Sequence, residues 1–146
     1  MIIARLAHSF PVRTNEWALS TIMLLIGLIL LNPFPTLATS PALYPLLRWG
    51  PEENWGIACL LVGMLRMIVL LINGSWRASP AWRAVFAFVG CLVWFQISLG
   101  LMASERVDQG LAIFPVFLAL DMYSMFRAGL DGRKVAEAAA GHTVTL

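Results

Sequence analysis

Charged residues are scarce in this sequence of 146 residues. They make up 12% of it, whereas soluble domains average about 25%. Hydrophobic residues make up 60%, and they concentrate in four blocks, at residues 17–31, 55–72, 82–103 and 111–126. Separate apolar blocks of this length are typical of membrane spans and not of one buried core. The composition excludes a water-soluble globule and predicts an all-α integral membrane protein.

Cysteine and histidine are also rare. Cys59 and Cys91 both lie inside apolar blocks, where cysteine usually behaves as a small hydrophobe. His8 and His142 lie near the ends of the sequence, outside every block, which disfavours a membrane haem because its axial ligands come from within the spans. No cluster of His, Asp and Glu has the spacing of metal ligands. We therefore expect no cofactor and no metal, and the net charge of +2 is too small to indicate nucleic-acid binding.

The motifs of the common enzyme classes are missing. The sequence contains no H-E-x-x-H, C-x-x-C, G-x-G-x-x-G or G-x-S-x-G, and no Walker A loop. Every predicted loop is short apart from residues 32–51, so there is no room for a soluble catalytic domain. We expect a protein that is not an enzyme and has no catalytic residues.

The hydrophobic pattern predicts a single integral membrane domain over residues 1–146, built as a bundle of four transmembrane helices. The expected spans are about 14–31, 52–73, 80–103 and 110–128. The last helix is expected to end near Asp131-Gly132 and to leave a flexible tail, 132–146. The first 38 residues also have the layout of a signal peptide, with a small-x-small site at Thr36–Ala38; we expect them to be retained.

The segment 32–50 differs from the spans in composition. With the adjoining Pro51 it carries five prolines, and it also carries aromatic residues of the kind that lie at membrane boundaries. This pattern predicts a short interfacial helix, about 41–49, on the membrane surface. A re-entrant loop is the less favoured alternative, because unpaired backbone at depth must be buried in protein or face water.

The basic residues predict the orientation. With four spans and both termini inside, seven cations fall on the inner face and two on the outer face. The inner set is Arg5, Arg13, Arg77, Arg83, Arg127, Arg133 and Lys134, and the outer set is Arg48 and Arg106. This positive-inside bias places both termini in the cytoplasm. The expected boundary anchors agree, with Tyr44, Trp49 and Trp55 outside and Trp76, Trp82 and Tyr123 inside.

Three strongly polar residues interrupt the spans: Arg66, Gln96 and Asp121. Arg66 and Asp121 both fall about 9–10 Å outward from the inner boundary at 1.5 Å per residue, which suggests an ion pair. A charge at the centre of a span costs roughly 2.5–3.5 kcal/mol, and pairing reduces that cost. The alternatives are that Arg66 extends to the inner headgroups, that the pair only fixes helix register, or that it serves a water-filled path or a proton site. Gln96 is expected to hydrogen-bond between helices.

One resemblance adds to this interpretation. The stretches RMIVLLINGSWRASPAWRAVFAFVGCLVWFQISLGL and LAIFPVFLALDMYSMFRA, within residues 66–128, resemble small uncharacterised membrane proteins encoded in bacteriophage genomes. The resemblance implies the inner membrane of a bacterial host and a role in lysis, as for holins, or in membrane remodelling. Holins typically have fewer spans and a more strongly basic tail.

Three functional hypotheses follow. The first is a protein that is not an enzyme and self-associates in the lipid bilayer, either as a hole-former or as a structural component. The second is an accessory subunit that packs against partner membrane subunits of a larger inner-membrane complex. The third is a small ion- or proton-coupled carrier that uses Asp121 and Arg66.

Overall fold

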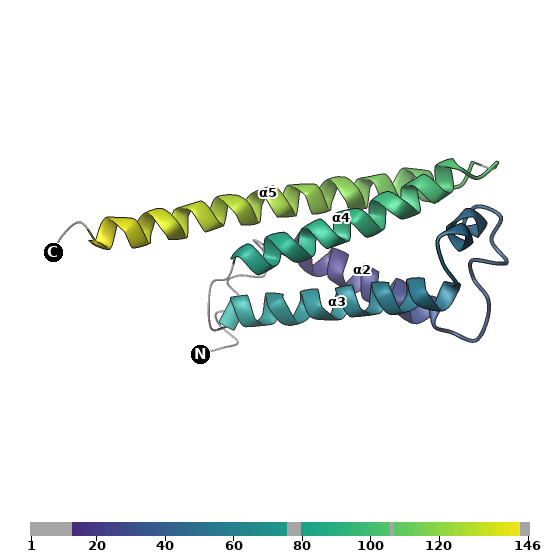
Figure 1. Ribbon diagram of the computed structural model, residues 1–146, viewed down its shortest axis with the longest axis horizontal. Helices are drawn as coiled ribbons and strands as arrows, with labels where there is room; N and C mark the ends of the chain where they lie inside the picture. Colours follow the sequence, from purple (N-terminus) through teal and green to yellow (C-terminus); the bar gives the residue numbers. More distant parts are fainter. Residues whose placement is uncertain (1–12, 76–79, 106, 144–146) are drawn as a thin grey trace.

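The computed structural model describes residues 13–75, 80–105 and 107–143. Within these ranges the chain is all-helical, with four α-helices and one short 3-10 helix. They are α2 (Thr14–Leu30), η1 (Tyr44–Arg48), α3 (Glu52–Ser75), α4 (Pro80–Met102) and α5 (Gly110–Thr143). The α-helices run alongside one another, with the 31–51 loop and the 103–109 turn together at one end (Figure 1). We call this the loop end, and the opposite end, where α2 and α4 begin, the terminal end.

Three helical segments in the described part of the chain are long and apolar enough to cross a membrane: Glu52–Ile72, Pro80–Met102 and Gly110–Glu137. Helix α2 is apolar but has only 17 residues. At 1.5 Å per residue it measures about 25 Å, slightly less than the roughly 30 Å of a hydrocarbon core. Length and composition therefore support three spans directly and leave α2 as a shorter apolar helix.

The helix boundaries follow from local chemistry. Glu52 and Glu53 lie in the first turn of α3, where the helix dipole favours negative charge. Pro80 is the first residue of α4, a position at which its missing amide is not needed. These two starts coincide with the starts predicted from the sequence.

Each helix buries one narrow stripe of side chains that repeats every three or four residues. The stripes are Glu16, Ser20, Met23, Gly27 and Leu30 on α2; Gly56, Cys59, Gly63, Arg66 and Leu70 on α3; Arg83, Ala87, Gly90, Trp94, Ile97 and Leu101 on α4; and Asp121, Ser124 and Ala128 on α5. Such spacing is typical of left-handed helix bundles. Small and polar residues share these stripes, as expected where helices pack in a membrane.

The helices pair as two antiparallel hairpins. Helix α2 packs mainly against α3, and α4 mainly against α5, while the hairpins meet through smaller contacts of α3 with α4 and of α2 with α5. The first hairpin is tight because Gly27 lets the backbones approach: a Cβ there would lie 2.8 Å from the Cα of Leu60. In the second hairpin, the ring of Trp94 packs on Phe114 and Phe117 at centroid distances of 5.9 and 5.2 Å.

Two expected elements differ from the structure. Helix α5 does not end at Asp131-Gly132 but continues to Thr143, because the alanine-rich segment after Gly132 favours helix. Residues 132–143 are thus helical. In the segment 32–50 only Tyr44–Arg48 is helical, as a 3-10 helix, since its prolines remove backbone donors and prevent a longer helix.

Candidate functional site

Arg66 and Asp121 meet in the interior of the bundle. Nη1 of Arg66 donates to Oδ2 of Asp121 at 2.8 Å, and Nη2 donates to Oδ1. The Arg66 residue is 3% exposed and Asp121 is fully buried, so Arg66 does not extend to the headgroups. Trp94 completes the arrangement, because its Nε1 donates to Oδ2 of Asp121 at 2.9 Å. We call these three residues the central cluster.

Gly90 makes the central cluster possible. Its α-carbon faces the ion pair, and an added Cβ would collide with Oδ2 of Asp121 and lie 2.9 Å from Nη1 of Arg66. Only a residue without a side chain leaves room for a forked arginine–carboxylate pair between α3 and α5. The missing side chain of Gly90 therefore makes room for the charges between the helices.

A second buried group of charges lies toward the terminal end. Arg83 donates from Nε to Oε2 of Glu16 at 3.0 Å and from Nη2 to Oε1 of the same carboxylate. Its Nη1 donates to Oδ2 of Asp131 at 3.0 Å. Arg83 is 5% exposed and Glu16 6%, whereas the Asp131 side chain is 42% exposed. We call these three residues the terminal cluster.

Arg83, one of the seven cations that the sequence assigns to the inner face, is buried in ion pairs. It is buried because the first turn of α4 faces α2 and α5. Arg13 lies nearby, and desolvation lowers the pKa of its guanidinium, with the positive charge of Arg83 adding to the effect, while Glu16 and Asp131 oppose it. The two arginines balance the two carboxylates in charge, although Nη1 of Arg13 is buried without a hydrogen-bond partner in the part of the chain described.

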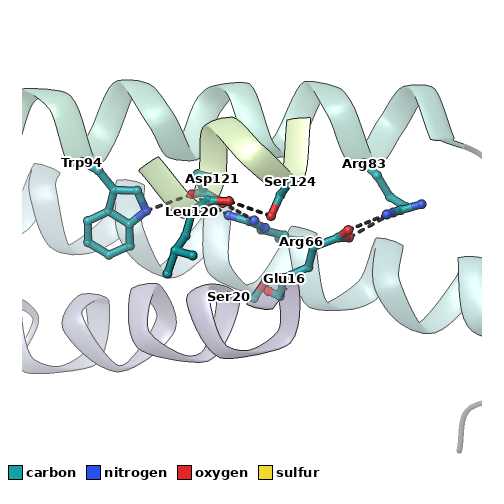
Figure 2. A network of polar contacts seen from close by, with 8 residues as sticks. All are labelled: Glu16, Ser20, Arg66, Arg83, Trp94, Leu120, Asp121 and Ser124. Atoms are coloured by element: carbon teal, nitrogen blue, oxygen red, sulfur yellow. Dashed lines mark hydrogen bonds and ion pairs between the residues drawn. The ribbon is translucent and has the colours of Figure 1, made fainter. Parts of the chain in front are cut away.

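Both clusters connect one hairpin to the other. In the terminal cluster Glu16 of α2 meets Arg83 of α4, the first helices of the two hairpins. In the central cluster Arg66 of α3 meets Asp121 of α5, the second helices. Each hairpin thus contributes one acid and one arginine to these two pairs, and each charge faces its opposite on the equivalent helix. Figure 2 shows the central cluster and, farther along the bundle, Glu16 and Arg83 of the terminal cluster.

The arrangement joins helices that lie apart in the sequence through buried charges. Both oxygens of Asp121 accept hydrogen bonds: Oδ2 accepts from Nη1 of Arg66 and Nε1 of Trp94, and Oδ1 accepts from Nη2 of Arg66. Ser20 and Ser124 donate to the carbonyls four residues earlier, Glu16 and Leu120. No metal-ligand group of three His, Cys, Asp or Glu residues occurs within the described ranges.

Gln96, the third polar residue in the spans, lies apart from both clusters. It is exposed on the outer face of α4, where its neighbours are the apolar residues Phe95, Leu92 and Leu99, which are 39–49% exposed. No described residue hydrogen-bonds its side-chain amide. Gln96 therefore does not join helices of one chain, and the bundle leaves a donor and an acceptor pointing outward from a candidate membrane span.

The predicted boundary anchors take different positions. Tyr44 and Trp49 at the loop end are 60% and 52% exposed, and Trp82 and Tyr123 are 59% and 54% exposed. Trp55 is half-buried, and its Nε1 donates to the carbonyl of Leu46 at 3.2 Å, so it holds η1 against α3. Trp76 lies outside the described residues.

Comparison with protein-family models, with curated proteins and with solved structures finds no match for this chain.

The sequence predicted the pair of Arg66 and Asp121 but not the terminal cluster or Trp94. A signal for the terminal cluster was present: Arg83, Ala87 and Gly90 follow one another at spacings of four and three. An arginine on the same stripe as small residues faces the helix interface, whatever its depth. Glu16 likewise lies four residues before the small residue Ser20, on the same stripe of α2.

Proposed function

We propose that this protein is a non-enzymatic integral membrane protein that acts by associating with further copies of itself in the bilayer. The observation that carries the proposal is the outward amide of Gln96 on α4. An amide without a partner in hydrocarbon costs several kcal/mol, and in a membrane only another polar side chain, backbone or water relieves that cost. The two charge clusters need no such help, because their charges are paired within one chain.

A second copy is the natural partner for Gln96. A carboxamide contains both a donor and an acceptor, so two glutamines complement each other. Copies inserted with one topology place Gln96 at the same depth, and a two-fold axis along the membrane normal brings the two amides together. Two reciprocal hydrogen bonds at about 0.6–2 kcal/mol each would stabilise such a dimer.

In the proposed orientation all four α-helices cross the bacterial inner membrane, with the terminal end in the cytoplasm. Arg13, Arg127 and Arg133 lie toward the terminal end, and an excess of basic residues at one end of a bundle favours a cytoplasmic location for that end. Helix α2 spans a slightly thinned bilayer, a modest cost for a short helix. The loop end, with Tyr44 and Trp49 exposed, lies at the outer boundary.

A hole-forming or membrane-remodelling activity, of the kind implied by the resemblance to phage membrane proteins, would place its path between subunits. The interior of one chain offers no such path, because its charges are paired with one another. Dye release from liposomes tests this version: release that rises with the protein-to-lipid ratio supports it, and no release over a concentration series refutes it.

Energy transfer between labelled copies in liposomes tests self-association itself. Replacing Gln96 with leucine should weaken the dimer by roughly ten-fold to several hundred-fold, the equivalent of about 1.2–4 kcal/mol. Gln96→Asn keeps the carboxamide and is the matched control, which should retain most of the association. If the leucine variant associates as well as the native protein, the proposal is wrong. Association only with a stoichiometric foreign subunit would favour the accessory-subunit hypothesis instead.

A further inference from the structure

An apolar cavity lies at the loop end of the bundle. Its volume is about 150 Å³, and all four α-helices, the 31–51 loop and η1 contribute to its wall. The residues that matter here are Ile29 on α2, Leu46 on η1, Cys59 on α3 and Ile97 on α4. Neither charge cluster lines it.

The chemistry of the wall excludes water as a stable occupant. The exposed wall is made of apolar atoms, and no described polar atom of the wall is buried without a partner. A buried water needs two to four polar partners, and an apolar cavity of about 150 Å³ lined by similar residues is known to stay dry and to bind apolar molecules. An empty cavity forfeits the dispersion contacts of its wall.

The structure covers the cavity with a fastened loop. The carboxylate of Glu52 accepts hydrogen bonds from the backbone amides of Thr36 and Leu37, at 2.6 and 3.0 Å. Trp55 holds η1 in the same region through the carbonyl of Leu46. Toward the side, Ile29 both lines the cavity and is 55% exposed on the surface of α2. The cavity is therefore covered by the loop, and at Ile29 its wall reaches the flank of the bundle.

We propose that this cavity is a binding site for the end of a phospholipid acyl chain from the surrounding bilayer. The inference rests on the membrane location given under the proposed function, but not on self-association. In that location the flank at Ile29 faces hydrocarbon, so acyl chains are the apolar molecules present at the entrance. A linear chain matches a wall that offers dispersion contacts and no polar group to orient a headgroup.

Photolabelling of the full chain in vesicles tests the site. The probe is a phosphatidylcholine with a diazirine at the end of one acyl chain, and labelled residues are mapped by mass spectrometry. Cys59 and Met23 are both 0% exposed, but only Cys59 lines the cavity. We expect label at Cys59 and none at Met23, and we expect Ile97→Phe or Leu46→Phe, each of which fills the cavity, to abolish the label at Cys59.

The outcomes distinguish failure of the cavity site from failure of the proposed membrane location. Label on the outer residue Leu61, 46% exposed, but not on Cys59 overturns the cavity site alone. Absence of label on Leu61 as well overturns the membrane location. Label at Cys59 from a free photoreactive fatty acid but not from the phospholipid overturns the assignment to membrane lipid. Two filling variants are used so that a folding defect in one, detected by circular dichroism, leaves the other to decide.

Discussion

The ion pair between Arg66 and Asp121 should show a large coupling energy in a double-mutant cycle. Arg66→Leu leaves a buried carboxylate without its counter-ion, and removing one partner of a buried pair costs about 3–5 kcal/mol. Asp121→Leu leaves Arg66 unpaired and also removes the acceptor of the Trp94 indole, which adds about 1–3 kcal/mol. The double variant Arg66→Leu/Asp121→Leu removes both charges, and only the indole remains unpaired, so it should cost about 1–3 kcal/mol.

The double variant is therefore expected to be more stable than either single variant. Adding Trp94→Phe to it should recover part of the remaining loss, because the unpaired indole N–H is then removed. The free energies of unfolding can be measured by titration with SDS in mixed micelles, followed by circular dichroism. Gln96→Leu is the matched control, a polar-to-leucine change in a span outside the clusters, and should change the monomer's stability by less than about 0.5 kcal/mol. Single-variant costs that simply add up in the double variant would refute the reasoning.

Three further results are expected from the same unfolding assay. Gly90→Ala should destabilise by about 1–3 kcal/mol or more, because the new methyl group collides with Asp121; a neutral effect would contradict the described geometry. In the terminal cluster, Glu16→Gln should lower the free energy of unfolding by several kcal/mol, because its carboxylate is buried. Asp131→Asn should lower it by about 1 kcal/mol or less, because its side chain is 42% exposed. The reverse order would disprove the assigned roles. Gly27→Ala should separate the first hairpin and cost about 1–3 kcal/mol, and unchanged stability would show that the hairpin is looser than described.

Depth along a helix could be predicted from the sequence, because each residue advances the chain by a constant rise. That is why the sequence alone assigns Arg66 and Asp121 to the same depth. Depth does not indicate which face of a helix a residue occupies or which helices are neighbours. Gln96 illustrates this limit: the sequence places it within a span, but only the packing of α4 shows that it points away from the bundle.

For charged residues near the ends of a span, the sequence does not show whether the side chain is solvated or buried. Glu16 and Arg83 lie within the first turn of their helices, where a charged side chain normally reaches water at little cost. Nothing in the sequence therefore required these two charges to be buried, and the structure pairs them because α2, α4 and α5 converge at that point. Trp94 was missed for a different reason, since an indole inside an apolar block reads as a hydrophobic residue until a buried acceptor is found beside it.

The end of α5 was also predicted incorrectly. Gly132 follows an aspartate and a leucine in the manner of a helix stop, but a glycine inside a helix costs only about 1 kcal/mol relative to alanine. The segment after it contains mostly good helix formers, so the helix continues to Thr143. A local stop signal is weaker evidence than the propensity of the residues that follow it.

Cross-linking of single cysteines on the outer face of α4 tests the central claim, self-association through Gln96, most directly. Leu92→Cys and Leu99→Cys lie one turn to either side of Gln96, and the native Cys59 and Cys91 are buried and supply the background. Oxidation in liposomes should join copies at positions 92 and 99, and adding Gln96→Leu should abolish the cross-link. Leu61→Cys on the outer face of α3 should not cross-link, although this variant still associates through Gln96. Equal cross-linking at position 61, or none on α4, would contradict the account.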